Sequence, residues 1–205
     1  MLSTTLKSLF LAGAVAAFAG LPAAASAAVL LVDDSGQLTG ARNVDVGGKL
    51  FDVQFVNGSC IGLFGGCDEA SDTDFANETD ALAAAQALLD QVFLDTPEGM
   101  FDSDPELTFG CSDVFFCDAR IPFEQGSPRG FVSFATATNS SPDFAPDSTD
   151  DGFSRIDSDT ADRDAAVYAR FTESVAGDVP APGALSLLGL GLAGLAVAGR
   201  RRKGG

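Results

Sequence analysis

The sequence contains no histidine, no tryptophan and a single tyrosine, Tyr168. The absence of histidine excludes Ser-His-Asp triads, histidine general acid–base catalysis and histidine-ligated metal sites. Paired carboxylates are the catalytic groups that remain, and with 29 acidic residues such pairs are too common to identify a site. The shortage of tryptophan and tyrosine also leaves few rings on which a glycosidase could stack a sugar. We therefore expect a protein that is not an enzyme and has no cofactor, with a small secreted hydrolase that uses paired carboxylates as the alternative.

Positive charge is scarce in the middle of the chain. Lys7 lies near the N-terminus and four basic residues lie at 200–203, so residues 28–179 hold seven basic residues against all 29 acidic ones, a formal net charge of −22. Such a charge repels nucleic acid and anionic membrane surfaces. It favours solubility and either metal cations or cationic partners, and a solvated surface alone would also explain it.

Residues 1–27 have the features of a secretory signal peptide in the expected order. Lys7 gives a small positive start, residues 9–21 are apolar, and an Ala-x-Ala sequence ends at Ala27. We expect the Sec export machinery and signal peptidase to act on this segment, with cleavage between Ala27 and Ala28. The mature chain would then begin with one acidic extracytoplasmic domain, residues 28–179, which is long enough to bury a core.

Four cysteines occur in this domain: Cys60, Cys67, Cys111 and Cys117. An even number in an exported chain predicts two disulfides, for which three pairings are possible. We favour Cys60–Cys67 and Cys111–Cys117, because each would close a short loop. A zinc site is the alternative, but it usually needs closer spacings such as Cys-x2-Cys.

The pattern of the domain predicts an α+β fold, mostly antiparallel sheet with one amphipathic helix packed on it. The helix is expected at 81–93, capped by Asn77 or Thr79, with Leu82, Ala85, Leu89 and Val92 on its buried stripe. A Gly47-Gly48 hairpin turn is expected between two strands. The predicted strands are 28–32, 37–46, 49–58, 106–111, 114–123, 129–138 and 164–174, the last with a short helix as the alternative; the predicted loops are 60–67 and 139–152.

One weak metal pattern lies in the second of these loops. Asp147, Thr149, Asp151 and Gly152 match positions 1, 3, 5 and 6 of a calcium-binding loop. The closing acidic residue should be at 158, which is a serine, and Asp157 lies beside it. A calcium site is one interpretation, and a solvated acidic loop is the other.

The tail has three parts: Pro180-Ala181-Pro182, an apolar stretch at 184–199, and the basic cluster 200–203 that begins with Arg200, Arg201 and Arg202. The apolar stretch is short for a transmembrane helix, which needs roughly 17–25 residues. The basic cluster would stay in the cytoplasm. Together with a signal peptide, this order resembles a PEP-CTERM sorting signal, here over 180–205 and with Ala181 in place of the glutamate that names the family.

The resemblance implies several further properties. The family's proteins are exported by Gram-negative bacteria and processed by an exosortase, and are associated with exopolysaccharide, biofilm and the cell-surface matrix. We therefore expect a membrane intermediate held by the C-terminal helix, then a cell-surface or extracellular-matrix protein with exosortase and exopolysaccharide as partners. A permanent single-span anchor is the alternative. A GPI anchor fits less well, because GPI signals end with apolar residues.

Overall fold

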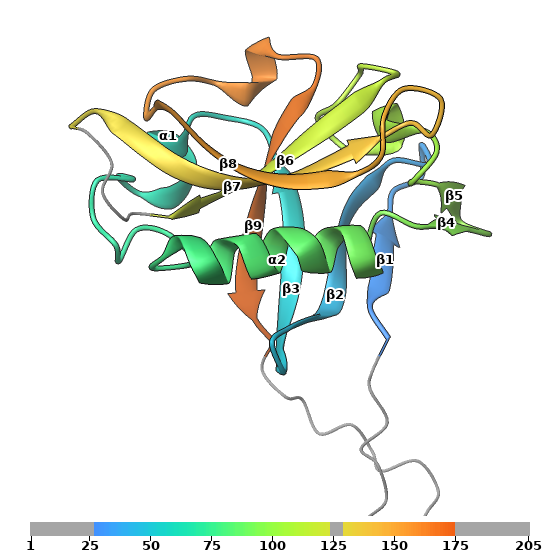
Figure 1. Cartoon of the computed structure of the whole chain (residues 1–205), viewed down its shortest axis with the longest axis horizontal. Coiled ribbons are helices and arrows are strands. Elements are labelled where there is room, and N and C mark those ends of the chain that lie inside the picture. Colours follow the sequence, from blue (N-terminus) through green and yellow to red (C-terminus); the bar gives the residue numbers. More distant parts are fainter. Residues whose placement is uncertain (1–26, 124–128, 175–205) are drawn as a thin grey trace, which may run out of the picture.

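The computed structural model describes residues 27–123 and 129–174, and a seven-stranded sheet runs through them (Figure 1). Its spatial order is β1-β2-β3-β9-β6-β7-β8, and only β6 and β9 pair in parallel. The expected, mostly antiparallel sheet is thus present, with one parallel pair at its centre. The strands are β1 (Val29–Val32), β2 (Leu38–Val46), β3 (Lys49–Val56), β6 (Phe116–Phe123), β7 (Phe131–Ser140), β8 (Ser148–Arg155) and β9 (Ala166–Glu173).

The hairpin of β2 and β3 forms where the sequence predicts it. Gly47 and Gly48 make its turn with φ of 61° and 90°, values that favour glycine. On β3, Val53 and Phe55 are buried while Gln54 between them is exposed. The alternating pattern of this segment therefore predicts its buried face correctly.

The long helix, α2 (Glu78–Gln91), begins three residues earlier and ends two residues earlier than the sequence indicates. Asn77 caps it, since its side chain accepts a hydrogen bond of 3.0 Å from the backbone N–H of Asp80. The predicted stripe is partly wrong, because Leu82 and Leu89 are only half-buried. The face that meets the sheet centres on Ala81, Ala84, Ala85 and Leu88, all fully buried.

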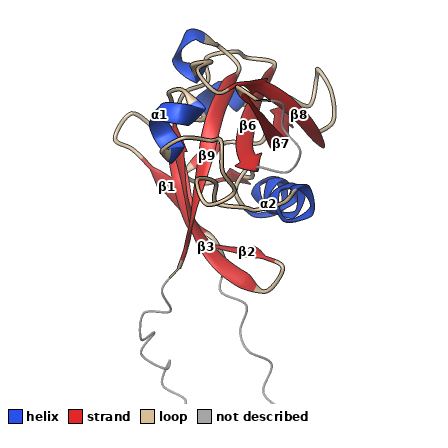
Figure 2. Ribbon diagram, turned by 90° about the vertical axis from the view of Figure 1, so that its left-hand side faces the viewer, coloured by secondary structure: helices blue, strands red, loops and turns tan. Residues whose placement is uncertain are grey.

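The sheet curls around α2. Figure 2 looks along this helix and shows β7 and β8 on one side of it and β2 and β3 on another. The helix contacts β2, β6, β7 and β8, although four strands separate β2 from β8 in the sheet. Small residues on both partners permit the close approach, including Ala84 on the helix and Ala119 and Ala137 on the sheet.

The opposite face of the sheet carries a second, smaller core. It consists of Cys60, Phe64, Cys67, Val132 and Tyr168. The first two belong to a short helix, α1 (Cys60–Phe64), so the expected loop at 60–67 is half helix. This helix ends at Gly65, whose φ of 84° suits a C-terminal glycine.

The strand predicted at 106–111 is wrong. A 3₁₀ turn, η1 (Pro105–Leu107), occupies its start, because proline fixes φ at the first position of such a turn. Only one isolated bridge, between Leu38 and Thr108, joins this segment to the sheet. A short hairpin connects α2 to η1. It consists of two strands of two residues each, β4 (Asp95–Thr96) and β5 (Gly99–Met100).

The predicted loop at 139–152 is also wrong over half its length. Strand β7 continues to Ser140, and β8 begins at Ser148. Polar residues dominate β8 because it is an edge strand with alternate residues in solvent. Strand β9 confirms the strand expected at 164–174 over the helical alternative.

The start of β1 and the end of β9 lie at the same end of the molecule (Figure 1). This follows from the three antiparallel pairings that link β1 to β9 through β2 and β3. Among the described residues, no helix is both long and apolar enough to cross a membrane. The predicted signal helix, except Ala27, and the predicted transmembrane helix at 184–199 lie outside those residues.

Candidate functional site

The loop from Cys111 to Cys117 is held on several sides. Both favoured disulfides, Cys60–Cys67 and Cys111–Cys117, are present, each with a Cα–Cα distance of 5.9 Å. The backbone N–H groups of Ser112 and Asp113 both donate to the carbonyl of Asp164, at 2.7 and 3.0 Å. The carbonyl of Phe115 accepts a bond of 2.8 Å from the N–H of Ser141. The loop is therefore fixed covalently at its base and by hydrogen bonds to two distant segments.

This fixed loop and the connection between β7 and β8 expose apolar side chains to solvent. Val114, Phe115 and Phe144 are 54%, 53% and 57% exposed, although they are large and hydrophobic. The ring centroid of Phe144 lies 5.4 Å from that of Phe115 and 6.0 Å from that of Phe116. We call Val114, Phe115, Phe116 and Phe144 the aromatic ridge.

A pocket adjoins the aromatic ridge and shares Phe116 with it. We call it the distal pocket. Its walls come from β6, from the segment before β9, and from the start of β9. It is lined by Phe116, Asp118, Arg120, Arg163, Asp164 and Ala166, together with Ala165.

The arginines of the distal pocket have few partners of their own. The guanidinium of Arg120 lies over the ring of Phe134, 4.8 Å from its centroid. Its Nε is buried and has no hydrogen-bond partner among the described residues. Burial lowers the pKa of Arg120, and the neighbouring charge of Arg163 acts in the same direction. Arg163 donates to the hydroxyl of Ser158 at 3.2 Å.

Neither arginine forms an ion pair within the described parts of the chain, where the single ion pair joins Arg155 to Asp157. The carboxylate of Asp118 accepts a bond of 2.8 Å from the Thr138 hydroxyl. Burial nevertheless raises the pKa of Asp118. Asp164 is exposed and accepts a bond of 3.2 Å from the Ser112 hydroxyl. The pocket thus offers hydrogen-bond donors on two arginines and acceptors on two carboxylates.

Three half-buried carboxylates predict an unusual dependence of stability on pH. Burial raises the pKa of Asp74, Asp118 and Asp147 in the folded protein. As the pH falls, the folded protein therefore takes up these protons at a higher pH than the unfolded chain does. Stability should therefore rise as the pH falls from 7, until the unfolded carboxyls titrate at about 3.9. We expect a higher melting temperature at a pH of about 5 than at pH 7.

Calorimetry across this range tests the expectation. Asp118→Asn keeps an oxygen that can accept the Thr138 bond, and it should raise the melting temperature at pH 7 and weaken the dependence on pH. A wild-type melting temperature that falls steadily from pH 7 to about 5 would contradict it.

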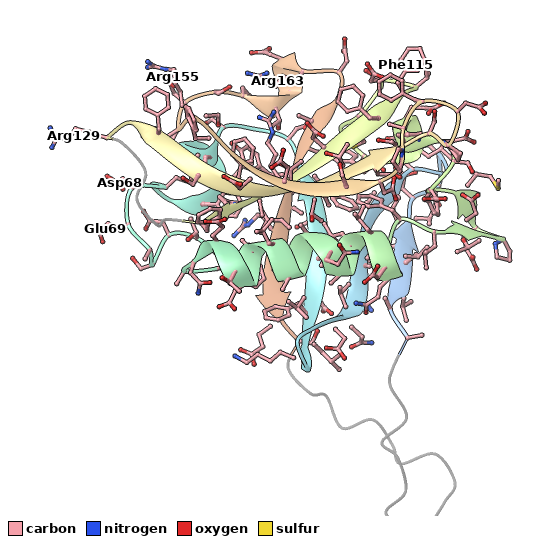
Figure 3. The ribbon with its side chains drawn as sticks, viewed as in Figure 1. Asp68, Glu69, Phe115, Arg129, Arg155 and Arg163 are labelled. Carbon is pink, nitrogen blue, oxygen red and sulfur yellow. A yellow bond between two sulfur atoms is a disulfide. The ribbon has the colours of Figure 1, made fainter. Side chains whose placement is uncertain are left out.

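The aromatic ridge and the distal pocket lie far from the ends of the sheet that lead to the rest of the chain. Figure 3 shows Phe115 and Arg163 along one border of the molecule, with the start of β1 and the end of β9 at the opposite border. This end-to-end separation gives the domain a connected end and a free end.

The structure separates the calcium candidates. Asp147 accepts a bond of 2.8 Å from the N–H of Ser140, Asp151 lies within strand β8, and Asp157 pairs with Arg155 at 2.9 Å. Within residues 27–123 and 129–174, no three acidic or cysteine side chains are grouped as metal ligands. The calcium-loop interpretation required a loop where the chain forms a strand.

The remaining predicted residues belong to the two processing signals. Ala27 and Ala28 directly precede β1. Pro180, Ala181, Pro182 and the arginines at 200–202 lie outside the described residues. Cleavage between Ala27 and Ala28 stays a prediction.

Sequence reasoning missed the aromatic ridge and the distal pocket. It assigned 114–123 to a strand, which places Phe115 in the sheet. One available signal was the spacing of Cys111 and Cys117, because a disulfide across so short a segment is incompatible with a straight strand.

Comparison with known families supports the interpretation of the tail. Residues 178–203 match the PEP-CTERM protein-sorting motif. The chain therefore carries this motif, which indicates an exported protein targeted to an exosortase. Comparisons with curated proteins and with solved structures find no match.

Proposed function

We propose that this chain, which carries a PEP-CTERM sorting motif, is a cell-surface or extracellular-matrix protein of a Gram-negative bacterium, is not an enzyme, and associates with exopolysaccharide. The observation that carries the proposal is the motif at residues 178–203. Exosortase processing of the tail would follow export and signal cleavage. A membrane intermediate would precede release or attachment at the surface.

The domain has properties that suit this setting. Its four cysteines are all paired, as expected for a protein that folds in an oxidising compartment. Its strongly negative net charge makes copies of the domain repel one another, which keeps them soluble at high local concentration. The free end of the domain points away from the segment that joins it to the tail, so its aromatic ridge remains accessible after sorting.

The intact mass of the protein recovered from the host's surface and medium tests this proposal. We expect a chain that begins at Ala28, ends near Pro180 and contains two disulfides. Any additional mass would identify what the exosortase attached. A membrane-bound species that still carries residues 200–205 would contradict exosortase processing and support the permanent anchor instead.

A secreted hydrolase is the second candidate, and one observation favours it. Asp118 and Asp164 line the same pocket, and burial raises the pKa of Asp118, as expected for a general acid. A hydrolase would release reducing ends from a polysaccharide, and both Asp118→Asn and Asp164→Asn would abolish that release. Turnover with this dependence would replace the first proposal.

A further inference from the structure

We propose that the aromatic ridge and the distal pocket form one binding site for a neutral polysaccharide. A sugar ring would stack on Phe115 or Phe144, and hydroxyl groups of the same or the next sugar would bind in the pocket. The inference rests on the proposed function, and it adds the location of the site and the chemical class of the ligand.

The exposed rings of the aromatic ridge are fixed in place. Exposure of apolar side chains to water is unfavourable, so a flexible loop would tend to turn them toward the interior. The Cys111–Cys117 disulfide and the bonds from Ser112 and Asp113 to Asp164 hinder that movement for Phe115. The backbone N–H of Phe144 donates a bond of 2.9 Å to the carbonyl of Ser141, which holds the second ring's segment in a turn. A rigid aromatic surface loses little conformational entropy when a ligand stacks on it.

The distal pocket combines hydrogen-bond donors with acceptors. A sugar hydroxyl both donates and accepts, so its recognition needs acceptors and donors close together. Arginine supplies only donors and a carboxylate only acceptors. Arg120 and Asp118 lie two residues apart on β6, line the same pocket, and are not ion-paired with each other. The Nε of Arg120 is buried and has no partner among the described residues, and its guanidinium lies at the pocket wall without a carboxylate partner among them, so its donors are not already used by an ion pair.

The pocket contains two arginines and two aspartates, so its formal charges cancel. The surrounding domain is strongly acidic and repels polyanions at long range. A polyuronate would meet this repulsion with no net positive charge at the pocket to offset it. A polycation would be attracted to the whole surface and would have no reason to favour this pocket. The balanced pocket therefore suits an uncharged polysaccharide.

The test uses the processed protein from the host and three probes: a neutral glucan, a polyuronate and chitosan. We expect the glucan to bind with an affinity that changes little between low and high salt, because no ion pairs form. Phe115→Ala and Phe144→Ala should each weaken binding about tenfold, as expected for a residue at the centre of a binding site. Arg120→Gln should weaken it further through the loss of buried donors.

The matched control is Phe153→Ala. Phe153 is 69% exposed on the edge strand β8 and does not line the pocket or contact the ridge. The Phe153→Ala variant should bind the glucan with the same affinity as the wild type. The melting temperature of each variant verifies that the fold is intact, which matters most for the half-buried Arg120.

Each other outcome overturns part of the argument. Glucan binding that survives Phe115→Ala and Phe144→Ala would place the polysaccharide site elsewhere and leave the proposed function standing. Salt-sensitive binding of polyuronate or chitosan that depends on these rings would overturn the neutral class. Failure of the wild type to bind any of the three probes would count against polysaccharide association itself, and so against both proposals.

Discussion

In the native host, a chain that ends at Gly177 is expected to lose its surface-associated form almost completely and to accumulate as a soluble exported protein. The truncation removes the residues that match the sorting motif, 178–203. It leaves the fold intact, because β9 ends at Glu173 and the last described hydrogen bond joins Ser174 to Leu50. Immunoblots of surface, membrane and medium fractions measure the distribution.

Ala181→Glu is the matched control for this truncation. It converts Pro-Ala-Pro into the Pro-Glu-Pro sequence for which the family is named, and it should be processed at least as well as the wild type. The melting temperature of the truncated protein should equal that of the processed wild type. If the truncated chain reached the surface at the wild-type level, the tail would not be the sorting signal.

Replacing Gly40 with alanine is expected to lower the free energy of unfolding by about 3 kcal/mol, a large effect for one added methyl group. Gly40 lies on β2 and pairs with Gln54 on β3. A β-carbon at this position would collide with the backbone carbonyl oxygen of Val53. Backbone atoms cannot rotate away as a flexible side chain can, so the two strands would have to separate locally.

Urea unfolding of the oxidised protein measures this difference. The control is Gly62→Ala, in helix α1, where the added carbon would approach only the Ser59 hydroxyl. That change should leave stability unchanged or raise it by up to about 1 kcal/mol, because alanine restricts the unfolded chain. Equal stability of Gly40→Ala and wild type would mean that β2 and β3 do not pair in the observed register.

The elements that the sequence predicts correctly are those whose pattern is local. The alternation in β3 and the Gly47-Gly48 turn each depend on a few neighbouring residues. The capping of α2 by Asn77 is equally local. The pairing of the cysteines could also be chosen, since both bridges close short segments.

The elements that the sequence does not reveal depend on distant partners. Strand β8 has the composition of a loop, and it is extended because β7 pairs with it along its whole length. Strand β9 lies between β3 and β6, an insertion that no local signal indicates. The segment 106–111 contains β-forming residues, but Pro105 starts a turn there.

The candidate site could not be predicted from the sequence for a related reason. The residues of the distal pocket come from β6 and from a segment more than 40 positions later, so only the fold brings them together. Phe115 and Phe116 look like core residues in the sequence. Phe115 is exposed because the disulfide loop carries it outside the strand, whereas Phe116 is half-buried beside Phe144, which comes from a different connection.

The central position of β9 determines how the domain would carry mechanical load. If the protein is held by its tail and binds a polysaccharide at its free end, as proposed, flowing water would put it under tension. That tension would enter through the end of β9 and act along the strand. Because β9 is hydrogen-bonded to β3 on one side and to β6 on the other, separation would require many of these bonds to shear together. An edge strand pulled along its axis would be held by hydrogen bonds on one side only, so the interior position of β9 makes the sheet more resistant to a pull on its tail.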